Sequence, residues 1–502
     1  MYDMDSLLTR LVVVTRGELS FGKTRLQRSL RTAARRVVPL FDKGNAPGEP
    51  PPTEPKQEKM KENDEARLKR LREKFHVDGD NKFDKLAHSV TPLWRHPYKK
   101  QLMFKYQDVC KQLQYLGQKL RKVEVAFPAD PKGLPCPVRP VLPSPIIEGY
   151  RNKDEFSIRQ GPNGEPKTVG FLVGSPADLD HVVCVSPEHI TVCKDSHKRV
   201  AKSFEEYIQR SPLPGCYESH FQGYWKHLVV RSNSAGQLMA IVVMHPQQLT
   251  PEELSREKQG LVEHFVHGPG REGCSLSSLY FQACRHSRCT HAQAPFELLH
   301  GQPYLEETLG GVRFRISPES FFQVNSPVAT YLYDAVRQLL RPKPQGTLLD
   351  VCCGTGTIGL TLAPQLHSVF GMDVSAQAIE DAKYNAQLNG IRNAQYQVGR
   401  AEVLLPQLRH QFVAEELSAV VNPGRGGLNK RAIRALREYK QIKRLVYISC
   451  KPEGVAMDNA VELCDSRPKA HKVGPPFQLQ LACPVDMFPQ TRHCELLLLF
   501  VR

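Results

Sequence analysis

The stretch LLDVCCGTGT, residues Leu348–Thr357, decides the fold of this chain. Its apolar run ends at Asp350 and leads through a glycine-containing turn into a helical pattern. Gly354 and Gly356 allow the backbone of that turn to approach a ligand closely at the N-terminus of a helix. The next strand pattern closes at Asp373, a position where a carboxylate usually binds ribose hydroxyls. The stretch therefore predicts a strand, a turn and a helix that hold a nucleotide-like cofactor.

Strand and helix patterns alternate after this point in the sequence. Helical patterns such as Ser375–Gly390 and Asn429–Gln441 fall between apolar runs. This alternation predicts an α/β domain over residues 311–502, with a doubly wound, Rossmann-like sheet and its ligand at the carboxyl ends of the strands. The seven strand patterns cover residues 347–353, 368–374, 394–399, 417–423, 444–450, 477–488 and 493–502.

Two cofactors fit the glycine turn. Gly354, Gly356 and Gly359 formally satisfy the dinucleotide fingerprint G-x-G-x-x-G, which supports a nicotinamide-dependent oxidoreductase. An acid just before the turn is more typical of an S-adenosylmethionine site, because the carboxylate of Asp350 would repel a pyrophosphate and a methyl donor has none. We therefore favour S-adenosylmethionine and a class I methyltransferase domain, and keep the dinucleotide as an alternative.

The first residues of the chain have the composition of a targeting segment. Residues 1–41 contain eight Lys and Arg residues, interleaved Ser and Thr, and few acids. This pattern predicts a mitochondrial targeting segment and a location in the matrix. The alternatives are a basic arm that binds nucleic acid or a disordered arm. Residues 42–83 are rich in proline and charge, and we expect a disordered, charged linker there.

A helical extension is predicted over residues 84–145. Leu102, Tyr106, Val109 and Leu113 recur at helical spacing, so this face is expected to pack on the body of the protein. The lysines Lys99, Lys100 and Lys105 are expected to face solvent or phosphate.

Residues 146–310 are expected to form a central, mainly antiparallel α+β domain that binds RNA. Short alternating runs broken by Gly and Pro predict strands at 161–174, 181–193, 224–233 and 237–246. Helical patterns at 202–211 and 251–268 accompany them.

Charge and cysteine usage narrow the partners of the chain. A formal net charge of +16 indicates a polyanionic partner such as nucleic acid. The sequence has no apolar run of the length that a bilayer requires, so we expect no membrane partner. The 14 dispersed cysteines predict free thiols in a reducing compartment.

Five Cys and His residues are candidate metal ligands, but their spacing does not match a zinc site, and no metal is expected. They are Cys274, Cys284, His286, Cys289 and His291.

Further motifs follow the glycine turn in an order that resembles the RNA uracil-5 methyltransferases, which use S-adenosylmethionine. The resemblance is strongest to the vertebrate mitochondrial branch of that family. It covers roughly residues 91–502 and includes GYRNKDEF, Gly149–Phe156, in the central domain. The motifs are Phe321–Asn325, Asn422–Leu428, Ser449–Pro452 and His493–Glu495.

The resemblance implies a function and roles for individual residues. It implies methyl transfer to carbon 5 of uridine in mitochondrial tRNA, rRNA or both, by a protein expected to be a monomer. Cys450 is the implied nucleophile, which adds to carbon 6 of the base, and Glu495 is the implied base, which removes the carbon 5 proton. Arg425 and Phe321 are the implied contacts to the RNA. The implied cofactor-binding residues are Gln323, Asp350, Cys352, Gly354, Gly356, Thr357, Asp373 and Asn422.

The sequence also departs from the family pattern. Asn422 and Gly424 stand in Asn-Pro-Gly-Arg where relatives usually have Asp-Pro-Pro-Arg, so a carboxylate is lost from the site. Lys451 replaces the usual Asn and is expected to lower the pKa of the neighbouring thiol. Asp373 replaces a more common Glu, and Cys352 and Thr357 replace an aromatic residue and an Asn. The four-cysteine iron–sulfur site of some bacterial relatives has no counterpart. These changes leave a second hypothesis, a catalytically weak or inactive RNA-binding or RNA-folding protein with a methyltransferase fold.

Overall fold

The computed structural model describes residues 69–70, 73, 76–128, 130–175, 181–216, 222–412, 416–467 and 474–502. The predicted targeting segment, and the predicted linker up to residue 68, lie outside the described residues. None of the helices in the described part of the chain is long and apolar enough to cross a membrane.

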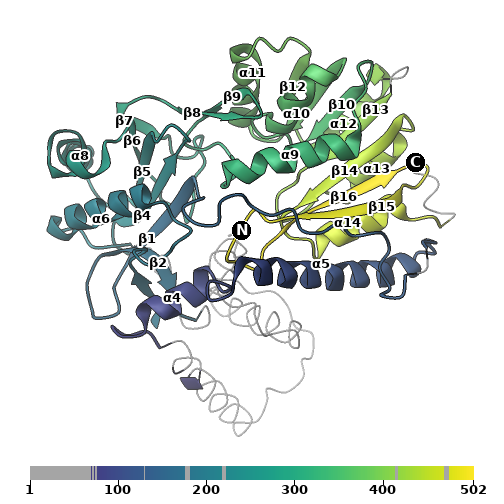
Figure 1. Cartoon of the computed structure of the whole chain (residues 1–502). Coiled ribbons are helices and arrows are strands. Elements are labelled where there is room, and N and C mark those ends of the chain that lie inside the picture. Colours follow the sequence, from purple (N-terminus) through teal and green to yellow (C-terminus); the bar gives the residue numbers. More distant parts are fainter. Residues whose placement is uncertain are drawn as a thin grey trace, which may run out of the picture.

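The central domain is built on a seven-stranded sheet with the order β3-β2-β1-β4-β5-β6-β7 (Figure 1). Its neighbouring strands are antiparallel except for β5 and β6, so the predicted mainly antiparallel α+β class is confirmed. The four predicted strands are present, and β1, β6 and β7 were not predicted. The bounds are β1 Lys153–Arg159, β2 Thr168–Val173, β3 Val183–Val185, α6 Asp195–Arg210, β4 Trp225–Ser232, β5 Leu238–Met244, α7 Pro251–Val262, a π-helix Glu263–His267, α8 Pro269–Cys274, β6 Ser278–Ala283 and β7 Glu297–Gly301.

The second large sheet contains all seven strands predicted for the α/β domain. Its order is β12-β11-β10-β13-β14-β16-β15. The first five strands in this order, from β12 through β11, β10 and β13 to β14, are parallel to one another. Strand β16 is antiparallel to both of its neighbours, β14 and β15. The bounds are α9 Ser326–Leu340, β10 Thr347–Val351, α10 Thr357–Leu362, β11 Ser368–Asp373, α11 Ala376–Leu388, β12 Ala394–Val398, α12 Ala401–Leu408, β13 Leu417–Val421, α13 Lys430–Glu438, β14 Ile442–Ser449, α14 Val455–Cys464, β15 Gln478–Val485 and β16 Glu495–Val501.

Helices cover both faces of this sheet, which confirms the doubly wound architecture. Buried side chains of α9, α10 and α11 pack in one core, and those of α12, α13 and α14 pack in another. Strands such as β13 and β14 are apolar along nearly their whole length, because both of their faces are buried.

A β-hairpin connects the two large domains. Its strands are β8 (Leu305–Leu309) and β9 (Val312–Ile316), joined at Gly310 and Gly311, both of which have positive φ. The expected boundary between residues 310 and 311 therefore cuts a hydrogen-bonded hairpin. Both strands contribute buried residues to a core shared by α9 and strands of the central domain, and the hairpin contacts α9, α10 and α11 of the α/β domain.

The helical extension contains α4 (Lys82–Val90) and α5 (Tyr98–Arg121), and α5 packs against α14 (Figure 1). Val109 and Leu113 are buried as predicted, and Lys99 and Lys100 are exposed. The expectation that Lys105 faces solvent or phosphate is wrong, because its side chain is 0% exposed. It forms an ion pair with Asp486, whose side chain is also 0% exposed.

Gly359 sets the distance between α10 and the sheet. A Cβ atom at this position would lie 2.7 Å from Cγ1 of Val369 and 3.0 Å from Oδ2 of Asp350. Gly359→Ala should lower the free energy of unfolding by about 1–3 kcal/mol, because the added methyl group overpacks this contact. Urea unfolding measures the change. Gly273→Ala, where an added Cβ meets no atom within 4 Å, is the matched control and should stay within about 0.5 kcal/mol. Equal stability of both variants would contradict the prediction.

Candidate active site

The register of the parallel strands aligns several predicted site residues. Val351 of β10 lies opposite Met372 of β11 and Val421 of β13. The residues that come next along each strand therefore reach the same carboxyl edge of the sheet, where ligands bind in open α/β folds. These residues are Cys352, Asp373 and Asn422.

The glycine turn leaves room for a ligand. Cys352, Gly354 and Gly356 have φ values of 63°, 56° and 78°, a left-handed region that favours glycine. A Cβ atom on Gly356 would lie 2.6 Å from the hydroxyl of Tyr396, so the turn packs closely on that side. A Cβ atom on Gly354 would have no neighbouring atom of a described residue within 4 Å. The space beside Gly354 is therefore open to a ligand.

Two carboxylates hold the turn from different sides. Asp373 accepts hydrogen bonds from the backbone N–H groups of Gly354 at 3.0 Å and Ser375 at 2.9 Å, so it links the turn to the end of β11. Asp350 is fully buried beneath the turn and accepts a hydrogen bond from Gly359 N at 2.9 Å. Burial raises the pKa of Asp350 to about 7. Asp350 was predicted to bind the cofactor, but in this position its contribution is to hold the turn and α10.

The remaining cofactor and RNA candidates lie on α10 and before α9. The hydroxyl of Tyr333 donates to Oγ1 of Thr357 at 3.0 Å. Gln323 is buried, and its backbone carbonyl accepts a hydrogen bond from Nδ2 of Asn152 at 2.8 Å. Asn152 belongs to the GYRNKDEF motif, so this bond joins the central domain to the cofactor side. Phe321 is 65% exposed, and its ring is free to meet a large ligand.

The antiparallel pairing of β14 and β16 brings the predicted nucleophile and base together. Ser449 of β14 lies opposite Leu496 of β16. The next residues outward are Cys450 and Glu495, which therefore face each other across the end of the pair, where opposite residues have Cα atoms about 4.5–5.5 Å apart. The thiol is half-buried and the carboxyl group is buried.

Burial, the charge of Glu495 and the charge of Arg425 determine the protonation of this pair. Burial and then the charge of Glu495 raise the pKa of Cys450 to about 11, against the opposing charge and hydrogen bond of Arg425. Burial also raises the pKa of Glu495 to about 7, against the opposing effect of Arg425. The cation that acts on the thiol is thus Arg425 rather than Lys451, whose Nζ lies 3.7 Å from Oε1 of Glu453. The expectation for Lys451 is wrong because its side chain turns to this exposed acid.

The sequence reasoning missed an apolar surface beside Asp373. Val374, Val398 and Val403 are 68%, 45% and 49% exposed. Val374 directly follows Asp373, and Val398 lies opposite Asp373 in the β11–β12 pair. Exposed apolar side chains of this kind are able to contact a flat aromatic ring. The available signal was an apolar residue directly after the acid that ends the strand.

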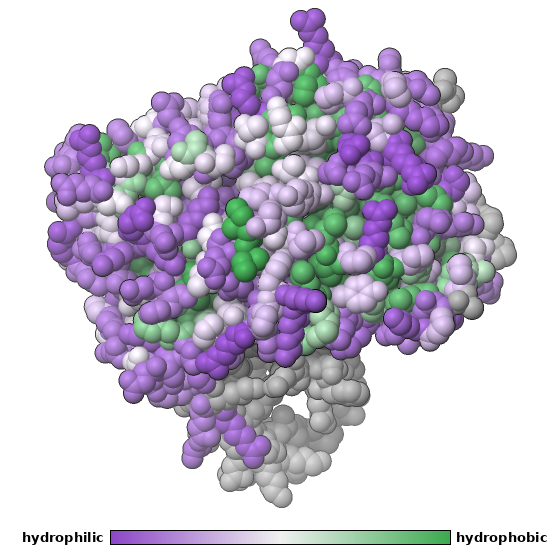
Figure 2. Space-filling view, viewed as in Figure 1, coloured by the Kyte–Doolittle hydropathy of each residue, from purple (hydrophilic) through white to green (hydrophobic). Residues whose placement is uncertain are grey.

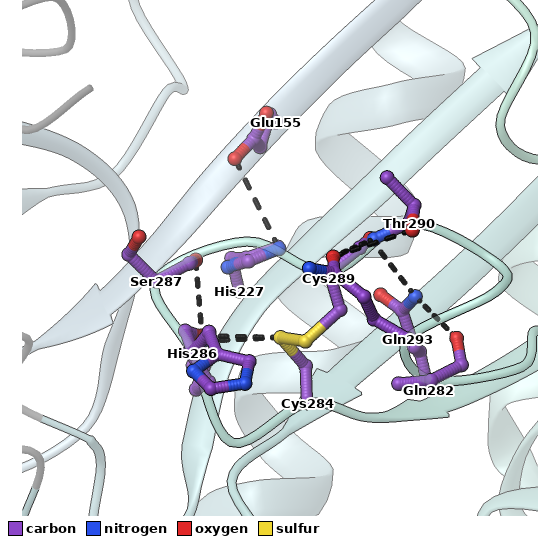
Figure 3. Close-up of a disulfide and its surroundings, with 11 residues drawn as sticks. Glu155, His227, Gln282, Cys284, His286, Ser287, Cys289, Thr290 and Gln293 are labelled. Atoms are coloured by element: carbon purple, nitrogen blue, oxygen red, sulfur yellow. Dashed lines mark hydrogen bonds and ion pairs between the residues drawn. A yellow bond between two sulfur atoms is a disulfide. The ribbon is translucent and has the colours of Figure 1, made fainter. Parts of the chain in front are cut away.

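The prediction of free thiols fails at one pair of cysteines. Cys284 and Cys289 form a disulfide in the loop between β6 and β7, with Cα atoms 5.7 Å apart (Figure 3). Nζ of Lys226 donates to the carbonyl of Ser287 at 3.2 Å and to that of His286, which orders the same loop. The other cysteines are free. Among the residues that the structure describes, no three His, Cys, Asp or Glu side chains are grouped to hold a metal ion.

Comparisons with known proteins agree with this geometry. The sequence model of the family described as tRNA (Uracil-5-)-methyltransferase matches residues 297–502. The chain is 46% identical to tRNA (uracil-5-)-methyltransferase homolog B of Danio rerio, over 84% of this chain and 87% of that protein. It is 46% identical to homolog B of Homo sapiens, over 84% of each chain, and 39% identical to homolog A of Mus musculus, over 85% of this chain and 70% of that protein.

A solved structure has a similar fold. It is the Pyrococcus abyssi tRNA (uracil-54, C5)-methyltransferase in complex with S-adenosyl-L-homocysteine. The TM-score is 0.55 and the sequence identity 22%, with 83% of this chain and 86% of that chain covered. This likeness confirms the expected fold of the α/β domain.

The charges around Cys450 predict opposite effects of two substitutions. Glu495→Gln should lower the pKa of Cys450, because it removes a negative charge that opposes the thiolate. Arg425→Gln should raise the pKa, because it removes the stabilising cation. The pH dependence of alkylation by iodoacetamide, followed by mass spectrometry of the Cys450 peptide, measures both shifts, and the half-buried thiol of Cys110 serves as internal reference. Identical alkylation profiles in the two variants would contradict the assignment.

Proposed function

The chain belongs to the tRNA (uracil-5-)-methyltransferase family, and from this premise we propose that it methylates carbon 5 of a uridine in mitochondrial tRNA, rRNA or both. The methyl donor is S-adenosylmethionine, and the reaction passes through a covalent adduct between Cys450 and carbon 6 of the base. The observation that carries this proposal is the β14–β16 register, which sets Cys450 beside Glu495.

The residues at the carboxyl edge fit a methyl donor. The donor would be held by the open space at Gly354, by the carboxylate of Asp373, which would bind the ribose hydroxyls, and by the exposed Val374, which would contact the adenine ring. Asn422 follows β13 between this site and Cys450. The sulfonium of the donor supplies an electrophilic methyl group when bound.

The chemistry that we assign to Cys450 and Glu495 balances in three steps. The thiolate of Cys450 forms a bond to carbon 6, and the electrons of the C5–C6 double bond move to the O4 carbonyl as an enolate. Carbon 5 of the enolate then forms a bond to the methyl group of the donor, while the bond between that methyl group and the sulfonium sulfur breaks and the sulfur would leave as a neutral thioether. Glu495 takes the proton from carbon 5, the double bond re-forms, and the S–C6 bond breaks to return the thiolate. One proton leaves for each methyl group transferred.

The protonation states suit the order of these steps. The carboxylate of Glu495 raises the pKa of Cys450, so the thiolate forms more readily while Glu495 is protonated. Bond formation to carbon 6 consumes the thiolate charge, and Glu495 can then ionise, because its pKa of about 7 is close to neutral pH. Arg425 favours the charged form of each group in turn.

Basic residues of the central domain lie beside the exposed Phe321, and one of them, Arg231, is buried. Lys153 of β1 lies opposite Arg231 of β4, and like charges in such a pair repel each other. Arg231, and then burial, lower the pKa of Lys153 to about 7. Arg231 also donates to the carbonyl of Ser320 at 2.5 Å, next to the exposed Phe321. The exposed aromatic ring of Phe321 can stack on an RNA base. The face drawn in Figure 2 is largely hydrophilic, with apolar patches between the hydrophilic residues.

A second candidate function is motivated by Asn422. Its amide oxygen accepts hydrogen bonds but lacks the negative charge that a carboxylate would bring near the sulfonium. A chain slowed in this way would bind and fold RNA more effectively than it methylates it.

A location in the mitochondrial matrix is part of the proposal and can be tested separately. Residues 1–41, fused to a fluorescent protein, should direct it to mitochondria, because import depends on basic, amphipathic character. The matched control replaces Arg25, Arg28, Arg31 and Arg35 by Glu and should stay in the cytosol. Cytosolic fluorescence of the unaltered fusion would refute the mitochondrial location and would leave the proposed methylation chemistry unaffected.

The methylation chemistry is tested with two active-site variants. Cys450→Ala should abolish 5-methyluridine formation on an unmodified tRNA transcript while cofactor binding is retained, because the adduct cannot form. Glu495→Gln should trap a denaturation-resistant adduct that already contains the methyl group, because the carbon 5 proton stays in place. Mass spectrometry of the nucleosides and gel mobility of the protein measure these outcomes.

Cys110→Ala is the control and should keep parental activity. Unchanged 5-methyluridine in Cys450→Ala would overturn the mechanism. A parent protein that binds RNA and cofactor without turnover on tRNA and rRNA transcripts would favour the non-catalytic candidate.

A further inference from the structure

The loop between β15 and β16, residues 486–494, leads directly into Glu495. A loop that delivers a catalytic side chain must be held in place, because small displacements of a reacting group are costly in rate. Several of the hydrogen bonds that fix this loop come from α5, which lies more than 360 residues earlier in the sequence.

Lys105 of α5 contacts both ends of the loop. Its Nζ forms the buried ion pair with Asp486 at the start of the loop. It also donates to the carbonyl of Phe488 at 2.9 Å and to the carbonyl of His493 at 2.9 Å. His493 lies two residues before Glu495. One ammonium group therefore satisfies a carboxylate and two carbonyls, and ties the end of β15 to the start of β16.

Neighbouring turns of α5 extend this contact along one helix face. Residues spaced three or four apart lie on the same face of a helix. Tyr98 donates its hydroxyl to Oδ2 of Asp486 at 3.0 Å. The backbone N–H of Gln490 donates to Oε1 of Gln101 at 2.7 Å. The guanidinium of Arg492 donates to the carboxylate of Asp108 at 2.9 and 3.1 Å.

The middle of the loop has a conformation that needs such support. Gln490 has a φ of 65°, which non-glycine residues rarely adopt. Its N–H is bound by Gln101 of α5, and its carbonyl accepts a hydrogen bond from Leu93 N at 2.9 Å, just before α5. The residues before and within α5 therefore hold the backbone of the loop on both sides of this residue.

We propose that Lys105 is a positioning residue that holds Glu495 in register for removal of the carbon 5 proton. This inference deepens the proposed function and rests on its assignment of Glu495 as the base. Lys105 acts on this step in particular, because the other parts of the site have separate supports. Cys450 follows a strand in the interior of the sheet, and the cofactor turn is held by Asp373 and Asp350.

The test separates methyl transfer from product release in single turnovers with radiolabelled donor and a tRNA transcript. The double variant Lys105→Met, Asp486→Asn removes both charges, so that no unpaired charge stays buried. Methylated adduct should form within about threefold of the parental rate. Release of free methylated RNA should slow by about 10- to 100-fold, so the adduct accumulates as it does in Glu495→Gln. Lys105→Arg, which keeps the cation, should restore part of the release rate.

Lys119→Met is the matched control. Lys119 lies on the same helix and pairs with Asp458 of α14 at 2.5 Å, away from the loop. It loses the same charge and should release product at the parental rate. If the double variant does not fold, as judged by circular dichroism and cofactor affinity, Asp108→Ala replaces it, since this change breaks only partly exposed ion pairs, with Arg492 and with Lys111.

The outcomes separate the inference from the proposed function. Adduct accumulation in the folded variant supports the inference. Formation and release that fall equally, or do not change, overturn it and leave the proposed function standing. Absence of trapped adduct in Glu495→Gln would overturn the assignment of the base, and with it both proposals.

Discussion

The antiparallel pairing of β16 with β14 is the constraint on which the active site depends. In a sheet of parallel strands, chemistry gathers at the carboxyl ends. A residue at the beginning of a strand can reach that edge only if its strand runs the other way. Glu495 begins β16 and Cys450 follows β14, so the reversal of one strand puts a base beside a nucleophile. A parallel β16 would place the same carboxyl group at the opposite edge of the sheet.

This arrangement also explains why the two groups oppose each other electrostatically. Burial disfavours the charged form of both, and each negative charge disfavours the other. The site therefore favours one negative charge at a time, and Arg425 is placed to stabilise it on either group. A pair that shares a single charge suits a reaction in which the thiolate is consumed before the base is needed.

Much of the α/β domain was predictable because its strands and its glycine turn are local patterns. The seven strands, the turn and the order of the motifs were found in this way. Pairings that form only in three dimensions were not. Lys105 stands three residues after Leu102 and four before Val109, so it lies on the apolar face of α5, but its partner Asp486 cannot be read from that spacing. The Cys284–Cys289 bond and the choice of Arg425 over Lys451 likewise depend on how loops fold back.

The position of β16 has a consequence for how the protein is made. It is the last of the seven strands in chain order, yet it lies between the fifth and sixth. Until β16 has left the ribosome, β14 and β15 have unpaired backbone N–H and C=O groups along the edges to which β16 later binds. Unpaired strand edges invite association with other chains. The strand that completes the catalytic pair is thus also the one that closes the sheet, so a nascent chain acquires its chemistry and loses its exposed edges in the same event.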